Sequence, residues 1–510
     1  TACRQTYPAG ASMKQIVVIG AGLGGISAAA HLASAGHRVT ILDKNAHIGG
    51  KLNELKKDGF TFDLGPSILT LLDRFEAVFA ASGRRMSDYI PVQRLDPQWR
   101  SFFEDGQVIS LYEDPAQMAR ELARFGCSEA QYRKFLAHCE KLYSIISLGY
   151  FDKGFDTLGD FLRGYSPANW FRLRFWQTMD HDVRRYFRDQ HLIDMFDFFI
   201  KYVGSSAYRA PAFMNMMSSI QVGRGLWYVP GGMYGIARGL EQLLTELGVT
   251  ILKNTEAVAI ESTALRGKRF LVNGVRLSDG RILPADIAVS NMEIIPAHKA
   301  LLSAPEAVQQ KLEKFEPACS GLVIELGVEG QYPQLAHHNF FFSGDQREHF
   351  ASVFEKKVLP HDPTVYLVAA SRSDTSVAPA GCETIKILPH IPHIVDTNPP
   401  TAGDYAALRE RVLEKLERMG LTDLRKRIIV EHFWTPVDIE RMYRSNRGAI
   451  YGVVTDKKKN LGFKGPKKSR LWQGLYFVGG SVNPGGGMPM VILSGTNAAG
   501  RVLDDLGPQA

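Results

Sequence analysis

Cysteine is scarce in this sequence. The chain has five cysteines in 510 residues, and no two of them have the spacing of a CxxC pair or of a zinc site. A low count without pairing is typical of a reducing compartment and argues against a disulfide-stapled secreted fold. We therefore expect a cytoplasmic protein with buried or incidental thiols at Cys3, Cys127, Cys139, Cys319 and Cys382.

Long apolar runs are also missing. The stretch from Ile16 to Gly36 is mostly apolar and about 21 residues long, but glycines follow after four strand residues and His31 stands near its middle. We expect no membrane-spanning helix, whereas a protein that lies on a membrane surface is compatible with this composition. Residues 1–12 lack an initiator methionine and the apolar centre of a signal peptide, so we expect Met13 to be the natural start and residues 1–12 to be an added leader.

The overall charge is moderately basic. The net charge is +7, and hydrophobic residues make up 45% of the chain, as in a globular protein with a sizeable core. The length corresponds to roughly two or three domains. A positive surface suits an anionic partner, either lipid headgroups or nucleic acid. We expect no nucleic acid, because no recognised nucleic-acid-binding module accompanies the basic residues.

One stretch near the N-terminus organises the rest of the chain. A β-branched run at 16–19 is followed by the glycine turn at 20–25, an Ala-rich helical stretch, a second apolar strand at 39–42 and then Asp43. This order and spacing predict a dinucleotide-binding βαβ unit. A glycine-rich turn of some other α/β domain is the alternative, but strands, helix and acidic residue all agree with the first interpretation.

Each part of this unit has a physical role. Gly20 permits the tight turn, Gly22 lets backbone N–H groups approach a pyrophosphate, and Gly25 lets the helix lie close to the strand. The helix N-terminus offers unpaired N–H groups and a partial positive charge to the phosphates. Asp43 is placed to accept hydrogen bonds from the ribose hydroxyls.

The C-terminal part has a second glycine-rich signature. A strand-like run at 475–478 leads into a loop at 479–487 that contains five glycines, and a helix start follows that is marked by Pro489. Between the two signatures, residues 115–205 have helical periodicity, and several short strand-like runs lie at 249–291 and 321–389. The charged stretch 405–427 predicts an amphipathic helix.

Two further segments carry a family resemblance. Gly49-Gly50-Lys51 and the run 60–67 follow Asp43 as they do in two-dinucleotide flavoproteins, and NAD enzymes generally lack this turn. Here the sequence resembles the FAD-dependent amine-oxidase-like superfamily and, within it, the bacterial phytoene desaturase branch. It departs from that pattern at Asp43, where relatives usually have Glu, and at Lys51, where they often have Arg.

Three longer strings narrow the resemblance. Residues 332–340, 444–452 and 479–490 look like the bacterial 4,4'-diaponeurosporene oxygenase subfamily, and the similarity runs from about residue 13 to about residue 495. Asn483 and Gly487 favour this branch over the desaturases. At 496–497 the chain has Thr and Asn where glutamines are expected.

The resemblance implies an α/β fold in which a two-dinucleotide, Rossmann-like FAD-binding domain adjoins a β-sheet substrate domain and a helical insertion. It assigns residues 13–80, 225–295 and 440–510 to the FAD-binding domain, 81–114, 206–224 and 296–439 to the substrate domain, and 115–205 to the insertion. It implies FAD as cofactor and the following binding residues: Ile19, Gly20, Ala21, Gly22, Leu23, Gly24, Gly25, Asp43, Lys44, Gly49, Gly50, Lys51, Asp63, Pro66, Val258, Gly479, Gly480, Met488, Pro489 and Met490.

The implied activity is oxidation of a terminal methyl group of a C30 carotenoid to an aldehyde. We expect hydride loss from an allylic carbon, followed by capture of the polyene cation by water or by an oxygen-derived nucleophile. A carotenoid desaturase or isomerase and a non-catalytic carotenoid- or lipid-binding flavoprotein are the alternatives. The chain length, C30 or C40, and the electron acceptor, O2 or a quinone, stay open. The catalytic residue is unknown, and Asp180, Asp182, Asp197 and Glu293 are candidates by polarity only.

The substrate suggests a location. Burying some thirty carbons is worth on the order of 20 kcal/mol, so the substrate must pass directly from a bilayer into the protein. Aromatic and basic residues alternate at 169–176 and 184–188, as suits a membrane surface or, equally, an ordinary helical cap. We expect a peripheral protein on the inner face of the cell membrane, docked through the insertion.

The adjacent pair His337-His338 raises the question of a metal. The two histidines are consecutive, and no carboxylate stands at helical spacing to complete a ligand set. A polar rim on an apolar wall is the favoured interpretation, and no metal is expected.

Overall fold

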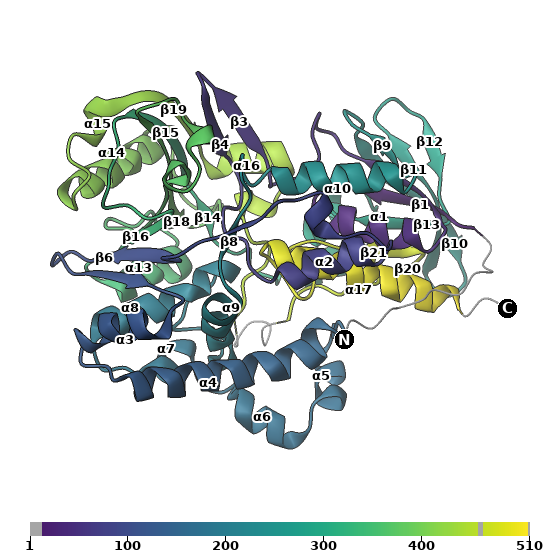
Figure 1. Ribbon diagram of the computed structural model, residues 1–510. Helices are drawn as coiled ribbons and strands as arrows, with labels where there is room; N and C mark the ends of the chain where they lie inside the picture. The colour runs from purple at the N-terminus through teal and green to yellow at the C-terminus, as the bar shows by residue number, and fades with distance from the viewer. Residues whose placement is uncertain (1–12, 457–462, 508–510) are drawn as a thin grey trace.

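A computed structural model describes residues 13–456 and 463–507 (Figure 1). The leader expected at residues 1–12 lies outside this range. The fold is α/β, with two large sheets and a helical part, and the two large sheets lie at opposite ends of the molecule (Figure 1).

The first sheet has five parallel strands drawn from three distant parts of the chain. Its order is β21 (Leu475–Phe477), β13 (Ile287–Ser290), β1 (Gln15–Ile19), β2 (Arg38–Leu42) and β9 (Thr250–Leu252). The predicted βαβ unit is present as β1, α1 (Leu23–Ser34) and β2. Parallel strands whose side chains are buried on both faces need cover on both sides.

Helices cover one face of this sheet and a second sheet covers the other. Apolar side chains of β1 and β2 pack with α1, α2 (Leu72–Ala80), α10 (Gly235–Glu246) and α17 (Met488–Leu506). The opposite face packs against β10 (Ala257–Leu265), β11 (Arg269–Leu277), β12 (Ile282–Pro284) and β20 (Trp472–Gln473).

The two ends of the chain meet where α1 lies on α17. Ser27 donates to the Ile492 carbonyl at 2.8 Å, and a Cβ at Gly495 would collide with the Gly24 carbonyl, so the two helices touch backbone to backbone. Thr496, which departs from the family pattern, is hydrogen-bonded to His31 at 3.0 Å.

The second large sheet is mixed and has eight strands. The order of seven of them is β19 (Ile428–Trp434), β15 (Val323–Glu329), β18 (Cys382–Ile391), β17 (Val365–Val368), β16 (His338–Phe341), β6 (Trp99–Phe102) and β7 (Val108–Leu111), and β14 (Ser320–Gly321) pairs with β18. The helices α14 (Ala402–Arg418) and α15 (Leu424–Arg427) cover one face. The expected single helix over 405–427 is therefore two, separated at Gly420, which has a positive φ of 114°.

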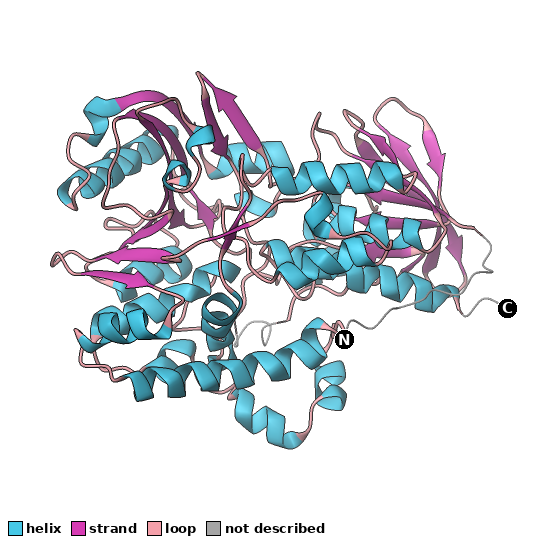
Figure 2. Ribbon diagram, viewed as in Figure 1, coloured by secondary structure: helices cyan, strands magenta, loops and turns pink. Residues whose placement is uncertain are grey.

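Residues 115–224 are almost wholly helical (Figure 2). They form α3 (Pro115–Ala123), α4 (Glu129–Ile146), η2 (Ser147–Phe151), α5 (Leu158–Gly164), α6 (Pro167–Leu173), α7 (Met179–Val183), α8 (Gln190–Asp197), η3 (Phe198–Val203), η4 (Ala212–Asn215) and α9 (Met216–Arg224). The α9 helix packs against α4. Side chains of Ser128 and Thr157 cap α4 and α5, which explains where these helices begin. In the described part of the chain, no helix combines the length and apolarity needed to cross a bilayer.

The smaller elements connect these parts. They are β3 (Glu54–Lys57), β4 (Phe60–Asp63), η1 (Met86–Asp88), β5 (Gln93–Arg94), β8 (Trp227–Tyr228), α11 (Ile294–Ala300), α12 (Glu306–Leu312), α13 (Gln346–Ala351), η5 (Ser352–Lys356), η6 (Ala370–Arg372), η7 (Thr375–Val377), α16 (Pro436–Tyr443) and η8 (Asn446–Gly448).

Candidate functional site

A large cavity opens at the carboxyl ends of the parallel strands. It encloses about 1700 Å³, counting the space at its mouth, and Ile19, Leu42, Asn291 and Gly479 mark the ends of four neighbouring strands on its wall. Ligands of open α/β sheets bind at this edge. The cavity thus lies where the N-terminal and C-terminal signatures meet.

Backbone geometry explains the glycines of the first turn. Gly20 has a φ of 95°, and a Cβ at Gly25 would collide with the Gly20 carbonyl. A Cβ at Gly24 would lie 2.9 Å from the Gly479 nitrogen. The N-terminal and C-terminal glycine turns are therefore packed directly on each other, as the sequence interpretation requires.

Asp43 is fixed by the backbone. Its carboxylate accepts hydrogen bonds from the N–H groups of Ala21 and Asn45, both at 2.8 Å. Burial raises the pKa of the Asp43 carboxyl, and those hydrogen bonds oppose the rise. The acid lines the cavity and holds the glycine turn in register with β2.

Lys51 lines the same cavity but has protein partners. Its ammonium group lies 3.1 Å from the Glu293 carboxylate and donates to the Ala449 carbonyl at 2.8 Å. Glu293 also accepts from the Asn446 N–H at 3.0 Å. This ion pair joins the turn at Gly49-Gly50-Lys51 to two segments that are remote in sequence, around residue 293 and at 446–449.

Thirteen of the twenty residues proposed from the sequence line the cavity. They are Ile19, Gly20, Gly22, Leu23, Asp43, Lys44, Gly49, Gly50, Lys51, Pro66, Gly479, Gly480 and Met488. The other seven, all in the described part of the chain, lie outside its wall: Ala21, Gly24, Gly25, Asp63, Val258, Pro489 and Met490.

The seven residues outside the wall have different contacts and surroundings. Gly25 donates its N–H to Asn291 at 3.1 Å, and Asp63 accepts from the Met233 N–H at 2.9 Å. Burial raises the pKa of Asp63 to about 6. Val258 is 40% exposed on β10, and the three residues just before it, Thr255, Glu256 and Ala257, line the cavity. Pro489 stands in the first turn of α17.

Sequence reasoning missed several wall residues. Asn291 follows β13 directly, and Lys386 reaches the wall from the second sheet, where it donates to the Asp63 carbonyl at 2.6 Å. Arg444, Tyr451 and Gly452 also line the cavity. The last three belong to the string 444–452, which carries part of the family resemblance. The sequence therefore marks this segment, but it does not indicate that the segment lines the cofactor cavity.

A second, narrower and apolar cavity lies beside the first and measures about 550 Å³ when the space at its mouth is counted. Its wall is Ile146, Tyr150, Phe151, Phe161, Phe175, Val203, Phe213, Met214, Met216, Met217, Thr455, Phe463, Pro484 and Met490. Residues at the start of α17 line both cavities, since Met488 and Val491 line the first and Met490 lines the second.

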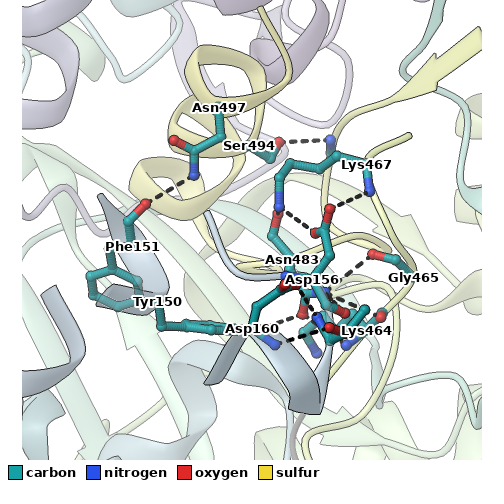
Figure 3. Close-up of polar contacts among 12 residues, drawn as sticks. Tyr150, Phe151, Asp156, Asp160, Lys464, Gly465, Lys467, Asn483, Ser494 and Asn497 are labelled. Carbon is teal, nitrogen blue, oxygen red and sulfur yellow. Dashed lines mark hydrogen bonds and ion pairs between the residues drawn. The ribbon is translucent and has the colours of Figure 1, made fainter. Parts of the chain in front are cut away.

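A polar network ties the insertion to the C-terminal glycine loop (Figure 3). Asn483 accepts from the Tyr150 hydroxyl at 2.6 Å and from the Lys464 N–H at 2.8 Å. Lys467 forms a buried ion pair with Asp156, and Asn497 donates to the Phe151 carbonyl at 2.9 Å. Asn483 and Asn497, both noted in the sequence, thus position the insertion against the loop.

Lys464 gives this network a testable pH dependence. Its buried amine donates to the Val453 carbonyl and to Thr455, and burial lowers its pKa to about 7 from 10.5. Between these values the folded amine has lost its proton and the unfolded one still holds it, so unfolding takes up a proton. This group should therefore make the free energy of unfolding rise with pH from about 7 to about 10.5, by up to about 1.4 kcal/mol per pH unit.

The comparison is between wild type and Lys464→Met in denaturant titrations at several pH values. The variant is expected to lose that part of the rise, whereas Lys468→Met, which also removes a lysine side chain but an exposed one, is the matched control. Equal slopes in wild type and Lys464→Met would show that the amine is not held neutral.

The proposed acid–base candidates do not gather at one place. Asp182 is buried among His138, Arg174 and Arg185, and Asp180 pairs with Arg184. Asp197 is buried, and both burial and nearby Asp180 raise its pKa well above the usual range. Of the four candidates, only Glu293 lines the first cavity.

The two adjacent histidines are interior residues. His338 lies on β16 and shares a 2.8 Å hydrogen bond with the Tyr366 hydroxyl, and burial lowers the pKa of both His337 and His338. Within the described residues, no group of three His, Cys, Asp or Glu side chains could hold a metal ion.

Comparison with known proteins agrees with this geometry. The family model described as flavin containing amine oxidoreductase matches residues 23–355. The chain belongs to this family. A 4,4'-diapolycopene oxygenase from Methylomonas sp is 53% identical over 97% of this chain and 99% of that protein. A 4,4'-diaponeurosporene oxygenase from Staphylococcus haemolyticus is 49% identical over 96% of this chain and 97% of its own length.

A solved structure of putrescine oxidase bound to putrescine shares the fold, with a TM-score of 0.63, 12% identity and coverage of 97% of this chain and 99% of that one. That structure shows the fold alone, which is α/β as the sequence predicted. Membership of the flavin containing amine oxidoreductase family makes the present chain an FAD-dependent enzyme, again as predicted.

The first cavity fits such a cofactor. The N-cap residues of α1 and α17 are Gly22 and Gly487, which have no side chain to cap the helix. Asn291 takes the Gly25 N–H of α1. Within the described part of the chain, the N–H groups of Leu23 and Gly24 in α1 and of Met488 and Met490 in α17 are left for an anionic or electron-rich ligand. Gly22 and Gly50 keep the wall open, since a Cβ at Gly50 would lie 3.0 Å from the Gly22 Cα. Bound FAD supplies a two-electron acceptor.

Proposed function

We propose that this flavin amine oxidoreductase oxidises a terminal methyl group of a C30 carotenoid to an aldehyde. The observation that carries the proposal is the apolar cavity beside the cofactor cavity, with residues at the start of α17 lining both. An elongated hydrocarbon end fits a wall of aromatic and methionine side chains. The names of the two oxygenases quoted above supply the substrate class.

FAD is inferred to occupy the first cavity. Asp43 would bind a ribose, the uncapped N-terminus of α1 would face the pyrophosphate, and the N-terminus of α17 would face the isoalloxazine ring. The thirteen wall residues named above are the proposed binding set. Val258 is proposed to contribute indirectly, because the preceding residues 255–257 line the wall. The FAD-binding, substrate and insertion boundaries given above are retained as proposals.

Conversion of a methyl group to an aldehyde removes four electrons and adds one oxygen. Water can supply that oxygen, and two rounds of two-electron transfer to FAD, each followed by reoxidation by O2 or a quinone, complete the balance. The protein itself contributes an apolar wall that excludes water. Thr455 and Tyr150 carry the hydroxyl groups of this wall, and the Tyr150 hydroxyl donates to Asn483. Exclusion of other water protects a delocalised cation until it is captured at the end of the polyene.

Access from a bilayer is proposed through the insertion. Leu148 and Phe171 are each 70% exposed and Trp176 is 56% exposed, and all three belong to the segment whose Phe151, Phe161 and Phe175 line the apolar cavity. An exposed apolar surface of this kind marks a membrane or partner site. We place the protein on the inner face of the cell membrane, bound at its periphery.

The function is tested by product mass. Purified holoenzyme on lipid vesicles is given 4,4'-diaponeurosporene under air, and products are trapped by borohydride before their oxygen exchanges with water. Gain of one oxygen is expected, and loss of hydrogen alone would instead favour the desaturase. With labelled O2 and ordinary water, an oxygen atom wholly from O2 would contradict capture by water.

A further inference from the structure

Lys201 is buried in an aromatic box. It lies on η3, is 4% exposed, and its ammonium nitrogen lies 3.9 Å from the ring centroid of Trp99, 4.0 Å from that of Phe340 and 4.6 Å from that of Tyr202. The rings of Phe198, Phe199 and Tyr366 stand within 6 Å. Among the described residues, this nitrogen has no hydrogen-bond partner.

The surroundings offer Lys201 no counter-charge. Within the described part of the chain it pairs with no carboxylate, and burial alone lowers its pKa well below the usual value. Two titratable groups interact electrostatically with Lys201, His338 and His390, and burial is the main cause that lowers the pKa of each. The Nε2 atoms of both histidines also lack a hydrogen-bond partner among the described residues. Without a counter-charge or a hydrogen-bond partner among the described residues, Lys201 favours the neutral form of its amine, in which the electron pair is free.

The box stands next to both cavities. Val203, two residues along η3, lines the apolar cavity. The Tyr202 carbonyl lies 3.4 Å from where a Cβ would stand on Gly487, which lines the cofactor cavity. His390 stacks near Tyr451, another residue of that wall, at 6.1 Å between ring centroids. Lys201 itself lines neither cavity, so a ligand end in the apolar cavity reaches the amine only when a ring of the box moves aside.

A structural role explains this residue poorly. An unpaired amine in an apolar interior costs stability, and a methionine of similar length would fill the same space without that cost. The buried lysines Lys386 and Lys464 illustrate the usual solution, because each donates to backbone carbonyls and a hydroxyl. Lys201 differs from them in having rings where they have acceptors.

We propose that Lys201 forms a reversible imine with the aldehyde end of a linear polyene. The Nζ atom attacks the carbonyl carbon, a carbon–nitrogen double bond replaces the carbon–oxygen double bond, and the oxygen leaves as water. No electrons are transferred, so no oxidant is needed. Desolvated lysines are suited to this reaction. The two amine hydrogens leave with the water, so the imine is neutral, as suits an apolar box without a counter-charge. The site would retain a water-insoluble aldehyde until hydrolysis or transfer to another amine.

This inference rests on the proposed function, because that function supplies the aldehyde. Its test does not depend on that function, because the aldehyde is added from outside. Wild-type holoenzyme is incubated with crocetin dialdehyde, a linear polyene dialdehyde, and then reduced with borohydride and digested. We expect a polyene adduct on the peptide that contains Lys201, at least tenfold above any adduct on Lys386 or Lys464. Before reduction we expect an absorption band at shorter wavelength than that of the aldehyde, because the imine is not protonated. Lys201→Met and Lys201→Arg should both lose the band while they retain FAD.

The outcomes separate the two claims. An adduct spread over exposed lysines, or no adduct in protein that retains its FAD, overturns the imine. Because the trapping is done on wild type, a misfolded variant does not weaken this result. Turnover of 4,4'-diaponeurosporene without a trapped adduct supports the proposed function and contradicts the imine. A trapped adduct without turnover supports the imine and contradicts the proposed function.

Discussion

Replacing Gly22 by alanine is expected to give a protein that no longer retains FAD. A Cβ at this position would collide with the Asn291 side chain, which accepts the Gly25 N–H and holds the first turn of α1 against β13. It would also enter the cavity wall at the point where backbone N–H groups must approach a pyrophosphate. We expect FAD affinity to fall at least tenfold, about 1.4 kcal/mol or more, as measured by the flavin-to-protein ratio after dialysis and by titration with FAD.

Gly500→Ala is the matched control. Gly500 lies on α17, one of the helices of the same core, and a Cβ there would have no atom within 4 Å, so this variant should retain FAD and gain slightly in helix stability. A Gly22→Ala protein as yellow as wild type would show that the cofactor does not lie against this turn.

The second large effect is on membrane binding. The double variant Phe171→Ala/Trp176→Ala removes two exposed rings that contact each other edge to face, with centroids 5.8 Å apart. Burying a large apolar side chain is worth about 1.5–3 kcal/mol, so even partial insertion of both rings predicts at least a tenfold loss of binding. Sedimentation with vesicles of phosphatidylethanolamine and phosphatidylglycerol measures it.

Ile429→Ala/Val437→Ala is the control, because these exposed apolar residues lie on β19 and α16, outside the insertion. It should bind vesicles as wild type does. Trp170 is left unchanged, since it packs against the interior cluster and its loss would disturb folding. If the Phe171/Trp176 variant sediments fully while retaining FAD, the insertion is not the docking surface.

Local sequence patterns predicted the parts of the site that are local. The βαβ unit depends on spacing within about 30 residues, and the start of α17 is marked by Pro489, so both could be placed from the sequence. The family resemblance then joined the two ends of the chain around one cofactor. The contact of Gly24 with Gly479 agrees with that joining.

The missed residues depend on contacts between remote segments. Lys386 reaches the cofactor cavity from a strand of the other sheet, and Asn291 acts through the Gly25 N–H 266 residues earlier. Neither spacing nor composition gives such pairings. Lys201 stands in an apolar run, 198–203, and its lack of a partner depends on rings supplied by β6, β16 and β17.

Buried polar residues were also hard to predict from polarity. Asp182 attracted notice as an acid but is satisfied by two arginines and a histidine, so its role is to hold the insertion together. The periodicity of 405–427 correctly predicts helix, but the break at Gly420 depends on a positive φ that periodicity does not reveal.

Anaerobic mixing of the oxidised holoenzyme with 4,4'-diaponeurosporene in vesicles tests most directly whether the two cavities work together. The visible absorbance of the flavin should be lost as the polyene is oxidised and should return when O2 or a quinone is admitted. If the flavin stays oxidised although the polyene is bound, this protein does not transfer electrons from the carotenoid to its FAD.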